Sequence, residues 1–288
     1  KPVSKAAVGK LGTSLQRMAE EDPGLTLTRD SGSGEMILAG LGDAHLDVTI
    51  ERLKRKFNVE VELSLPRVPY RETVGKKAVA EYTHKKQTGG HGQYARVVIE
   101  VEPLPRGTGL QFGDRVVGGA VPKEFIPAVE KGVVETAASG VFAGYELTDC
   151  QVTLTDGKHH PVDSNEMSFK LAASQALKEA VQDIGGTLLE PIMTIRVFAP
   201  EDHAGDVVGD LNTKRAKIHG INPDGGMSVI EAEVPLAEVQ RYASDLRSIT
   251  QGRGAFELSF DHYGEVPPQI AARVAAEHKK VLEEAHAH

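Results

Sequence analysis

The fold is decided by the stretch TIRVFAPEDHAGDVVGDLNTKRAKIHGINPDGGMSVIEAEV, residues 194–234. Apolar residues alternate at its start, which is typical of a strand, and Asn222-Pro223-Asp224-Gly225-Gly226 predicts a tight hairpin. The predicted elements here are a strand over 194–198, a helix over 204–217, a strand over 227–234, a helix over 236–249 and a strand over 255–260. With the first arm of the hairpin, this is the order of a ferredoxin-like split βαβ sandwich.

Residues 1–70 repeat this order, except that the first strand is missing. The predicted elements are a helix over 4–21, strands over 25–28 and 35–39, a helix over 44–57 and a strand over 59–65. We expect the missing strand just before Lys1, and therefore expect the chain to be a fragment of a longer protein.

Residues 71–193 are predicted to form an α+β domain between the two sandwiches. Its predicted elements are strands around Tyr82, 97–101 and 151–154, and helices over about 123–139 and 164–183. Asp163-Ser164 precedes an apolar periodic run and predicts the N-cap of the second helix. A last helix, from Pro268 onward, needs an apolar groove to pack in.

The expected architecture is thus α+β with three domains. The domains are residues 1–70, residues 71–193 together with the packing helix 268–288, and residues 194–267.

Composition limits the classes of function. A net charge of −8 argues against nucleic-acid binding over the whole surface, so cations have to be concentrated locally, as at Lys85, Lys86, Arg96 and Lys158. A single cysteine, Cys150, excludes an internal disulfide framework, and no run of about 18 apolar residues could span a bilayer. We expect a protein of the reducing cytoplasm, not associated with membranes.

Two basic, small-residue loops, 85–94 and 156–164, are the strongest functional signal. Gly89, Gly90 and Gly92 permit close backbone approach, while lysine and histidine side chains supply positive charge, a combination suited to a phosphate chain. The alternative interpretation is an ordinary glycine-rich hairpin with solvated charges.

Signals for chemistry are weak. His91, His159, His160 and Asp163 could be combined into a metal site, but adjacent histidines in an extended segment point to opposite sides. The sequence contains no G-x-x-x-x-G-K-[ST] loop and no G-x-S-x-G elbow. We expect no metal, no cofactor and no catalytic residue in this chain. A metal-dependent hydrolase remains as a remote alternative.

Two further loops carry weaker signals. In Gly40-Leu41-Gly42-Asp43-Ala44-His45, Asp43 is expected to cap the helix that follows and His45 to be a packed or interface residue. The loop 248–254, with Arg253 between two glycines, suits either a contact site or a tight helix-to-strand connection.

Together these segments resemble the C-terminal half of bacterial elongation factor G, the ribosomal translocase family, over essentially the whole chain. The segments that carry the resemblance are residues 18–23, 40–46, 69–73, 87–94, 117–125, 162–167, 189–193, 205–212 and 250–256. The resemblance implies the family's third, fourth and fifth domains, the fourth with a ribosomal-protein-like fold. The family's GTP-binding domain, with its GTP and magnesium, would lie outside this chain.

The resemblance also implies roles for residues. The fourth domain's tip would enter the A site of the small subunit and touch transfer RNA and messenger RNA. The implied tip contacts are Lys85, Lys86, Gln87, Gly89, Gly90, His91, Gln93, Lys158, His159, His160, Asp163 and Ser164. Arg253, Lys214 and Arg215 would face the large-subunit factor-binding centre, and Asp43 and His45 would relay changes between domains. A monomer that binds ribosomes is expected.

Some residues depart from the family's usual tip. The family has arginine where His91 stands, an acidic residue where Pro161 stands and glycine where Ala95 stands. These departures leave two interpretations open, an ordinary translocase and an elongation factor G-like paralogue. A ribosome-recycling or ribosome-protection factor is the alternative within the same superfamily.

Overall fold

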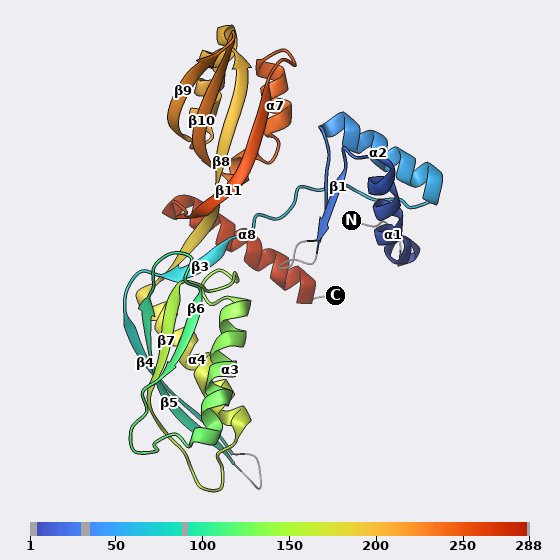
Figure 1. The fold of residues 1–288 in the computed structure, drawn as a ribbon. Coiled ribbons are helices and arrows are strands. Elements are labelled where there is room, and N and C mark those ends of the chain that lie inside the picture. Colours follow the sequence, from blue (N-terminus) through green and yellow to red (C-terminus); the bar gives the residue numbers. More distant parts are fainter. Residues whose placement is uncertain (1–4, 30–34, 88–91, 287–288) are drawn as a thin grey trace. The chain divides into compact units, whose positions relative to one another are not determined.

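A computed structural model describes residues 5–29, 35–87 and 92–286 of the chain (Figure 1). The chain divides into two compact units, one made of residues 1–69 and 192–261, the other of residues 70–191 and 262–288. We describe each part by itself. The mixed α+β class expected from the sequence is confirmed.

The N-terminal segment forms two helices and a two-stranded antiparallel sheet. Its elements are α1 (Lys5–Glu21), β1 (Thr26–Arg29), β2 (Met36–Ala39) and α2 (Asp43–Phe57). Its core contains Leu11, Leu15, Met18, Leu25, Leu53 and Val59. Leu11, Leu15 and Met18 recur at helical spacing in α1, which is why the sequence predicts this helix correctly.

The strand predicted over 59–65 is wrong, because only Val61 there has a strand-type bridge. In the sandwich of residues 192–261, the last strand pairs with the first one. Among the described residues no strand precedes α1, so no partner strand of this kind is described for the segment 59–65.

Residues 192–261 complete a split βαβ unit. Its elements are β8 (Gly186–Pro200), α5 (Ala204–Thr213), β9 (Lys217–Asp224), β10 (Met227–Pro235), α6 (Leu236–Val239), α7 (Tyr242–Ile249) and β11 (Ala255–Glu265). The strand order β11-β8-β10-β9 is that of the ferredoxin-like fold, and Gly225 and Gly226 make the predicted hairpin with positive φ values of 57° and 87°.

Two helices of this sandwich differ from the prediction. The first ends at Thr213 and not at residue 217, because Arg215 adopts a left-handed φ of 59° that a helix cannot continue through. The second is interrupted after Val239, since Arg241, with φ −116° and ψ 19°, departs from helical geometry before α7 begins.

The other unit contains a four-stranded sheet, two long helices and a separate short strand that pairs with the start of β8. Its elements are β3 (Arg71–Val74), β4 (Ala78–Lys86), β5 (Gln93–Pro103), β6 (Leu110–Asp114), the short 3-10 helix η1 (Lys123–Phe125), α3 (Ile126–Ser139), β7 (Cys150–Lys158) and α4 (Glu166–Ile184). The sheet order is β4-β5-β7-β6, with β6 parallel to β7 and the other pairs antiparallel.

The core of this unit lies between β5 and α4. Alternate residues of β5 are buried, as the period of two predicts: Ala95, Val97, Ile99 and Val101. They pack on a face of α4 that is rich in alanine. At Gly132 a side chain would overlap the carbonyl oxygen of Lys170, so this glycine lets α3 and α4 approach closely.

The terminal helix α8 (Pro268–His286) packs on this unit. His278 stacks on Tyr145 with ring centroids 4.2 Å apart, and its Nδ1 lies 2.9 Å from the carbonyl oxygen of Ala143. Val274 is buried in the same cluster. The groove that the apolar spacing of this helix requires is thus formed by loop 140–147 and the start of β8.

Loop 141–145 is organised by one carboxylate. Glu72, fully buried in β3, accepts the backbone N–H groups of Val141 and Phe142 through Oε2 and those of Ala143 and Tyr145 through Oε1, at 2.6 to 2.9 Å. Four donors saturate the carboxylate, which explains how a charge can be buried here.

Among the described residues, no helix combines the length and the apolar character needed to cross a membrane.

Candidate nucleic-acid interface

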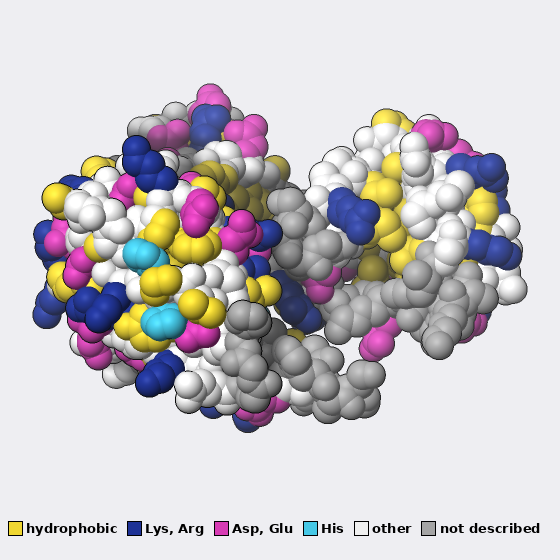
Figure 2. Space-filling model, turned by 90° about the horizontal axis from the view of Figure 1, so that it is seen from below, with side chains coloured by type: hydrophobic (Ala, Val, Ile, Leu, Met, Phe, Trp, Pro, Cys, Tyr) yellow, Lys and Arg dark blue, Asp and Glu magenta, His cyan; other side chains and the backbone are white. Residues whose placement is uncertain are grey.

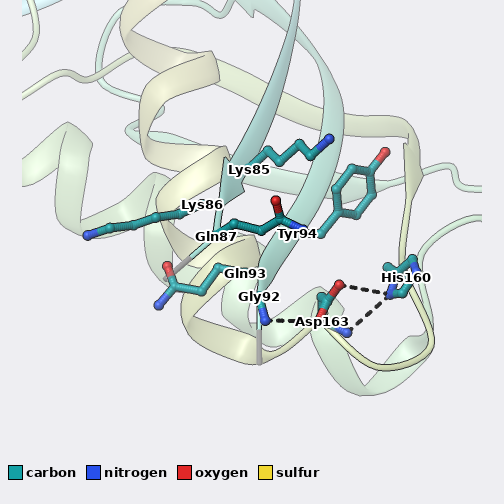
Figure 3. A pocket seen from close by; sticks show the side chains of 8 residues that line it. All are labelled: Lys85, Lys86, Gln87, Gly92, Gln93, Tyr94, His160 and Asp163. Atoms are coloured by element: carbon teal, nitrogen blue, oxygen red, sulfur yellow. Dashed lines mark hydrogen bonds and ion pairs between the residues drawn. The ribbon is translucent and has the colours of Figure 1, made fainter. Parts of the chain in front are cut away.

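The two basic loops meet at one end of the sheet (Figure 3). Lys85 and Lys86 are not in a loop, as the sequence suggested, but are the last residues of β4, paired with Tyr94 and Gln93 of β5. The second loop leaves the end of β7 at Lys158 and returns into α4. Together they surround a hollow of about 240 Å³ lined by Lys85, Lys86, Gln87, Gly92, Gln93, Tyr94, His160 and Asp163. We call this end of the unit the tip.

Asp163 joins the two loops. Its Oδ1 accepts the backbone N–H of Gly92 at 2.9 Å, and its carbonyl oxygen accepts the backbone N–H of Tyr94 at 2.8 Å. Ser164 adds a third link, because its hydroxyl donates to the carbonyl oxygen of Tyr94 at 2.6 Å and accepts the backbone N–H of His160 at 2.8 Å. The tip is therefore a cross-linked structure in which both loops hold each other.

His160 is held in place by this network. Its Nδ1 lies 3.3 Å from both Oδ2 and the backbone nitrogen of Asp163, and its ring meets Tyr94 edge-on with a centroid separation of 6.3 Å. The side chain remains about half exposed, at 52%. Within the parts of the chain that the structure describes, Nε2 has no hydrogen bond, so this ring nitrogen is available to a partner.

The cap of α4 differs from the prediction. Asn165, not Asp163-Ser164, is the N-cap, and its side chain accepts the backbone N–H of Ser168 at 2.8 Å. Asp163 and Ser164 are instead used to join the loops.

The cations of the tip fall into two groups. Lys85, Lys86 and Lys158 are exposed, and none has an ion-pair partner within the described ranges. Arg96, also expected to be available, instead forms a two-pronged pair with Glu81 at 2.6 and 2.7 Å. The hydrogen bond from Arg96 lowers the pKa of the Glu81 carboxyl, so this charge is internally balanced.

Figure 2 looks onto the lower end of Figure 1 and shows histidine, basic, acidic and apolar side chains interspersed in this view. Exposed apolar residues near the tip include Val117 and Val162, 85% and 62% exposed. A surface that mixes cations with apolar and aromatic groups suits nucleic acid better than it suits a purely ionic partner.

A third segment also approaches the tip. The sequence does not single out this segment as a contact. Nδ1 of His159 lies 3.5 Å from the carbonyl oxygen of Ala120, and Gly118 and Gly119 have φ values of 71° and 72°. A side chain at Gly157 would collide with Val121. In the sequence, the two adjacent glycines after Val117 are the signal that could have identified this loop.

Three predicted tip residues, Gly89, Gly90 and His91, lie outside the described residues. The described residues contain no group of three His, Cys, Asp or Glu side chains placed to hold a metal ion. His160 and Asp163 lie together, but both are committed to the loop network.

The three cations predicted to face the large subunit differ in their surroundings. Lys214 is 16% exposed and bridges Asp245 at 2.8 Å and Asp210 at 3.5 Å; burial alone would lower its pKa, but these carboxylates raise it. Arg215 pairs with Glu238 at 2.8 Å. Arg253 is half exposed, with its Nη2 2.6 Å from Nε2 of His203 and 3.4 Å from Oδ2 of Asp202.

The pair predicted to relay between domains is also described. Gly42 occupies the N-cap of α2 with no side-chain cap, and Asp43 is in the first helical turn, so the expected Asp43 cap is wrong. His45 is packed: Nδ1 accepts the backbone N–H of Leu41 at 3.1 Å, and Nε2 donates to Asp22 at 3.1 Å. His45 thus joins the start of α2 to the end of α1.

Comparison with known proteins agrees with this architecture. Residues 1–65 match the model for elongation factor G domain III, residues 66–184 that for domain IV, and residues 187–274 that for the elongation factor G C-terminus. The chain therefore belongs to the elongation factor G family, and none of these three domains is its GTPase domain.

Two relatives illustrate the match. An elongation factor G-like protein of Thermotoga maritima is 48% identical over 284 residues, which are 98% of this chain and 42% of that protein. A crystal structure of a protein from Thermus thermophilus superposes with a TM-score of 0.83 at 42% identity, covering 97% of this chain and 42% of that one. The chain thus spans less than half the length of these relatives.

Proposed function

We propose that this chain is the ribosome-binding part of a translational GTPase that promotes movement of transfer RNA and messenger RNA during elongation. The observation that carries the proposal is the tip, where His160 and exposed lysines, with no ion pair in the described part of the chain, surround a hollow in a cross-linked scaffold. Phosphate contacts position such a protein on RNA. A scaffold that is already ordered before binding lowers the entropy cost of binding.

The proposal assigns partners to two surfaces. The tip contacts transfer RNA and messenger RNA in the decoding region of the small subunit, and the exposed Arg253 contacts the large-subunit factor-binding centre. Lys214 and Arg215 support that surface from within through their ion pairs. Under this proposal the chain acts as a cytoplasmic monomer without catalysis of its own, and a separate domain binds GTP and magnesium.

Cosedimentation of the chain with bacterial ribosomes over a series of salt concentrations tests this. We expect binding to weaken steeply with salt, and Lys86→Ala with Lys158→Ala to reduce the slope of log K against log salt by about 1.5. The matched control is Lys76→Ala with Lys279→Ala, which removes the same charge from exposed positions outside the tip. Equal binding by both double variants at near-physiological salt would refute the tip contact, and absence of ribosome binding would refute the function.

A second candidate is a paralogue that acts in ribosome recycling or protection. The Thermotoga maritima relative is called an elongation factor G-like protein, a name that fits a paralogue without specifying its step. A toeprinting assay separates the two, because a translocase moves messenger RNA on the ribosome, whereas a recycling factor splits the subunits and a protection factor releases a bound drug.

A further inference from the structure

An aromatic ring lies among the cations of the tip. Tyr94 pairs with Lys85 across β5 and β4, and Figure 3 shows its ring between the Lys85 side chain and His160. The ring is partly exposed and lines the hollow. Within the described residues its hydroxyl makes no hydrogen bond, so no internal partner accounts for a polar aromatic residue here.

The position of this ring is fixed by its neighbours. The backbone N–H of Tyr94 donates to Asp163, and its carbonyl oxygen accepts from Ser164. The edge of His160 supports one side of the ring at a centroid distance of 6.3 Å and an interplanar angle of 65°. A ring held in this way can stack on a ligand without first being ordered.

Phosphate binding alone does not explain this arrangement. Lys85 and Lys86 could neutralise phosphates, but the face of a tyrosine ring has no group that binds a phosphate. Proteins that hold single-stranded nucleic acid combine cations along the backbone with aromatic rings on which bases stack. Gln93 precedes Tyr94 in β5, so its side chain points to the other face of the sheet, where its Oε1 accepts from His84 at 2.9 Å.

We propose that the tip hollow receives one unpaired nucleobase of single-stranded RNA, stacked on Tyr94, with a flanking phosphate on Lys85, which lies on the same face of the sheet. This inference rests on the proposed function and adds a base site to a surface otherwise expected to contact backbone. Bases within a duplex are stacked on each other, so the ligand is an unpaired nucleotide.

Fluorescence of an eight-nucleotide RNA with one central 2-aminopurine tests the proposal directly. Stacking on Tyr94 quenches the fluorescence, and a matched oligonucleotide that is abasic at this position should bind about 5- to 150-fold more weakly with the same salt slope. Tyr94→Leu should lose the quenching and weaken binding within that range, while Tyr94→Phe retains both. Lys85→Ala should instead reduce the salt slope.

The outcomes separate this inference from the proposed function. If ribosomes bind the chain but wild-type protein neither quenches 2-aminopurine nor distinguishes the abasic RNA, the base site is refuted and the ribosome-binding proposal stands. The abasic comparison uses wild-type protein, so it decides the question even if Tyr94→Leu does not fold.

Discussion

The carboxylate of Asp163 accepts the backbone N–H of Gly92 at 2.9 Å, across 71 positions of sequence. A Cβ at position 92 would lie 3.0 Å from Cγ of Asp163, so a larger residue there would crowd the carboxylate. We expect Asp163→Ala to speed hydrogen exchange of the Gly92 amide about fivefold, equivalent to about 1 kcal/mol, while Gly92→Ala displaces the carboxylate and loosens the same link.

The control for this prediction is Asp156→Ala. Asp156 is also a partly exposed carboxylate near the tip, but it pairs with Arg96 at 3.5 Å and not with the loops. Equal exchange at Gly92 in wild type and Asp163→Ala would contradict the cross-link.

Removal of the Glu72 carboxylate should destabilise the unit built from residues 70–191 and 262–288. Glu72→Ala leaves four backbone donors without their acceptor, and we expect the free energy of unfolding in urea to fall by about 3 kcal/mol or more. Glu72→Gln, which keeps one oxygen, should cost less. Glu146→Gln, at an exposed position 3.8 Å from Arg71, should change the free energy by less than about 0.5 kcal/mol; an equal effect of Glu146→Gln would contradict the prediction.

The thiol of Cys150 should resist modification in the native protein. Burial in the core raises its pKa to about 12, with a smaller contribution from the charge of Asp149. We expect no reaction with a disulfide reagent at pH 8 until urea unfolds the chain, whereas Val117→Cys in a Cys150→Ala background should react at once. Rapid stoichiometric labelling of native Cys150 would show that this core opens readily.

The raised pKa of Cys150 also makes the stability of the fold depend on pH. The unfolded thiol ionises near its ordinary value of about 8.5 while the folded thiol remains protonated. Its contribution to stability is therefore complete below that pH and is lost as pH rises toward 12. Cys150→Ala should remove this part of the alkaline loss, measured as urea unfolding at pH 8 and 10; an unchanged alkaline loss would contradict it.

Asp22 should titrate differently without His45. The hydrogen bond from His45, followed by that from the Gly24 backbone, lowers the pKa of the Asp22 carboxyl. Its stabilising contribution is therefore present above the ordinary carboxyl pKa and is lost as pH falls through the lowered one. In carbon-detected NMR titrations, His45→Ala should raise the Asp22 pKa more than Arg52→Ala, whose guanidinium lies 4.0 Å away. An identical Asp22 titration in wild type and His45→Ala would refute the pairing.

The fold was largely predictable because most elements have a clear apolar period. In β5 the alternation of Ala95, Val97, Ile99 and Val101 corresponds directly to the buried face. The errors arose where the backbone conformation of one residue or a contact distant in sequence determines the local structure. The left-handed conformation of Arg215 ends a helix early. The segment 59–65 has no described partner strand.

The position of the tip could be predicted from the sequence, but the hydrogen bonds between its two loops could not. Asp163-Ser164 before an apolar run resembles a helix cap, and only the spatial approach of Gly92 shows that the carboxylate has another use. Likewise Arg96 looked available, because the cross-strand position of Glu81 depends on the register of β4 and β5.

The packing of α8 has a consequence for how the chain is made. Val266 and Val274 fill the apolar cluster with Leu188, yet the whole segment 192–261 intervenes in sequence. A nascent chain leaving the ribosome therefore presents a bare apolar groove during the synthesis of an entire inserted domain. The interrupted unit can close only after its last helix has emerged, so its maturation follows that of the domain inserted within it.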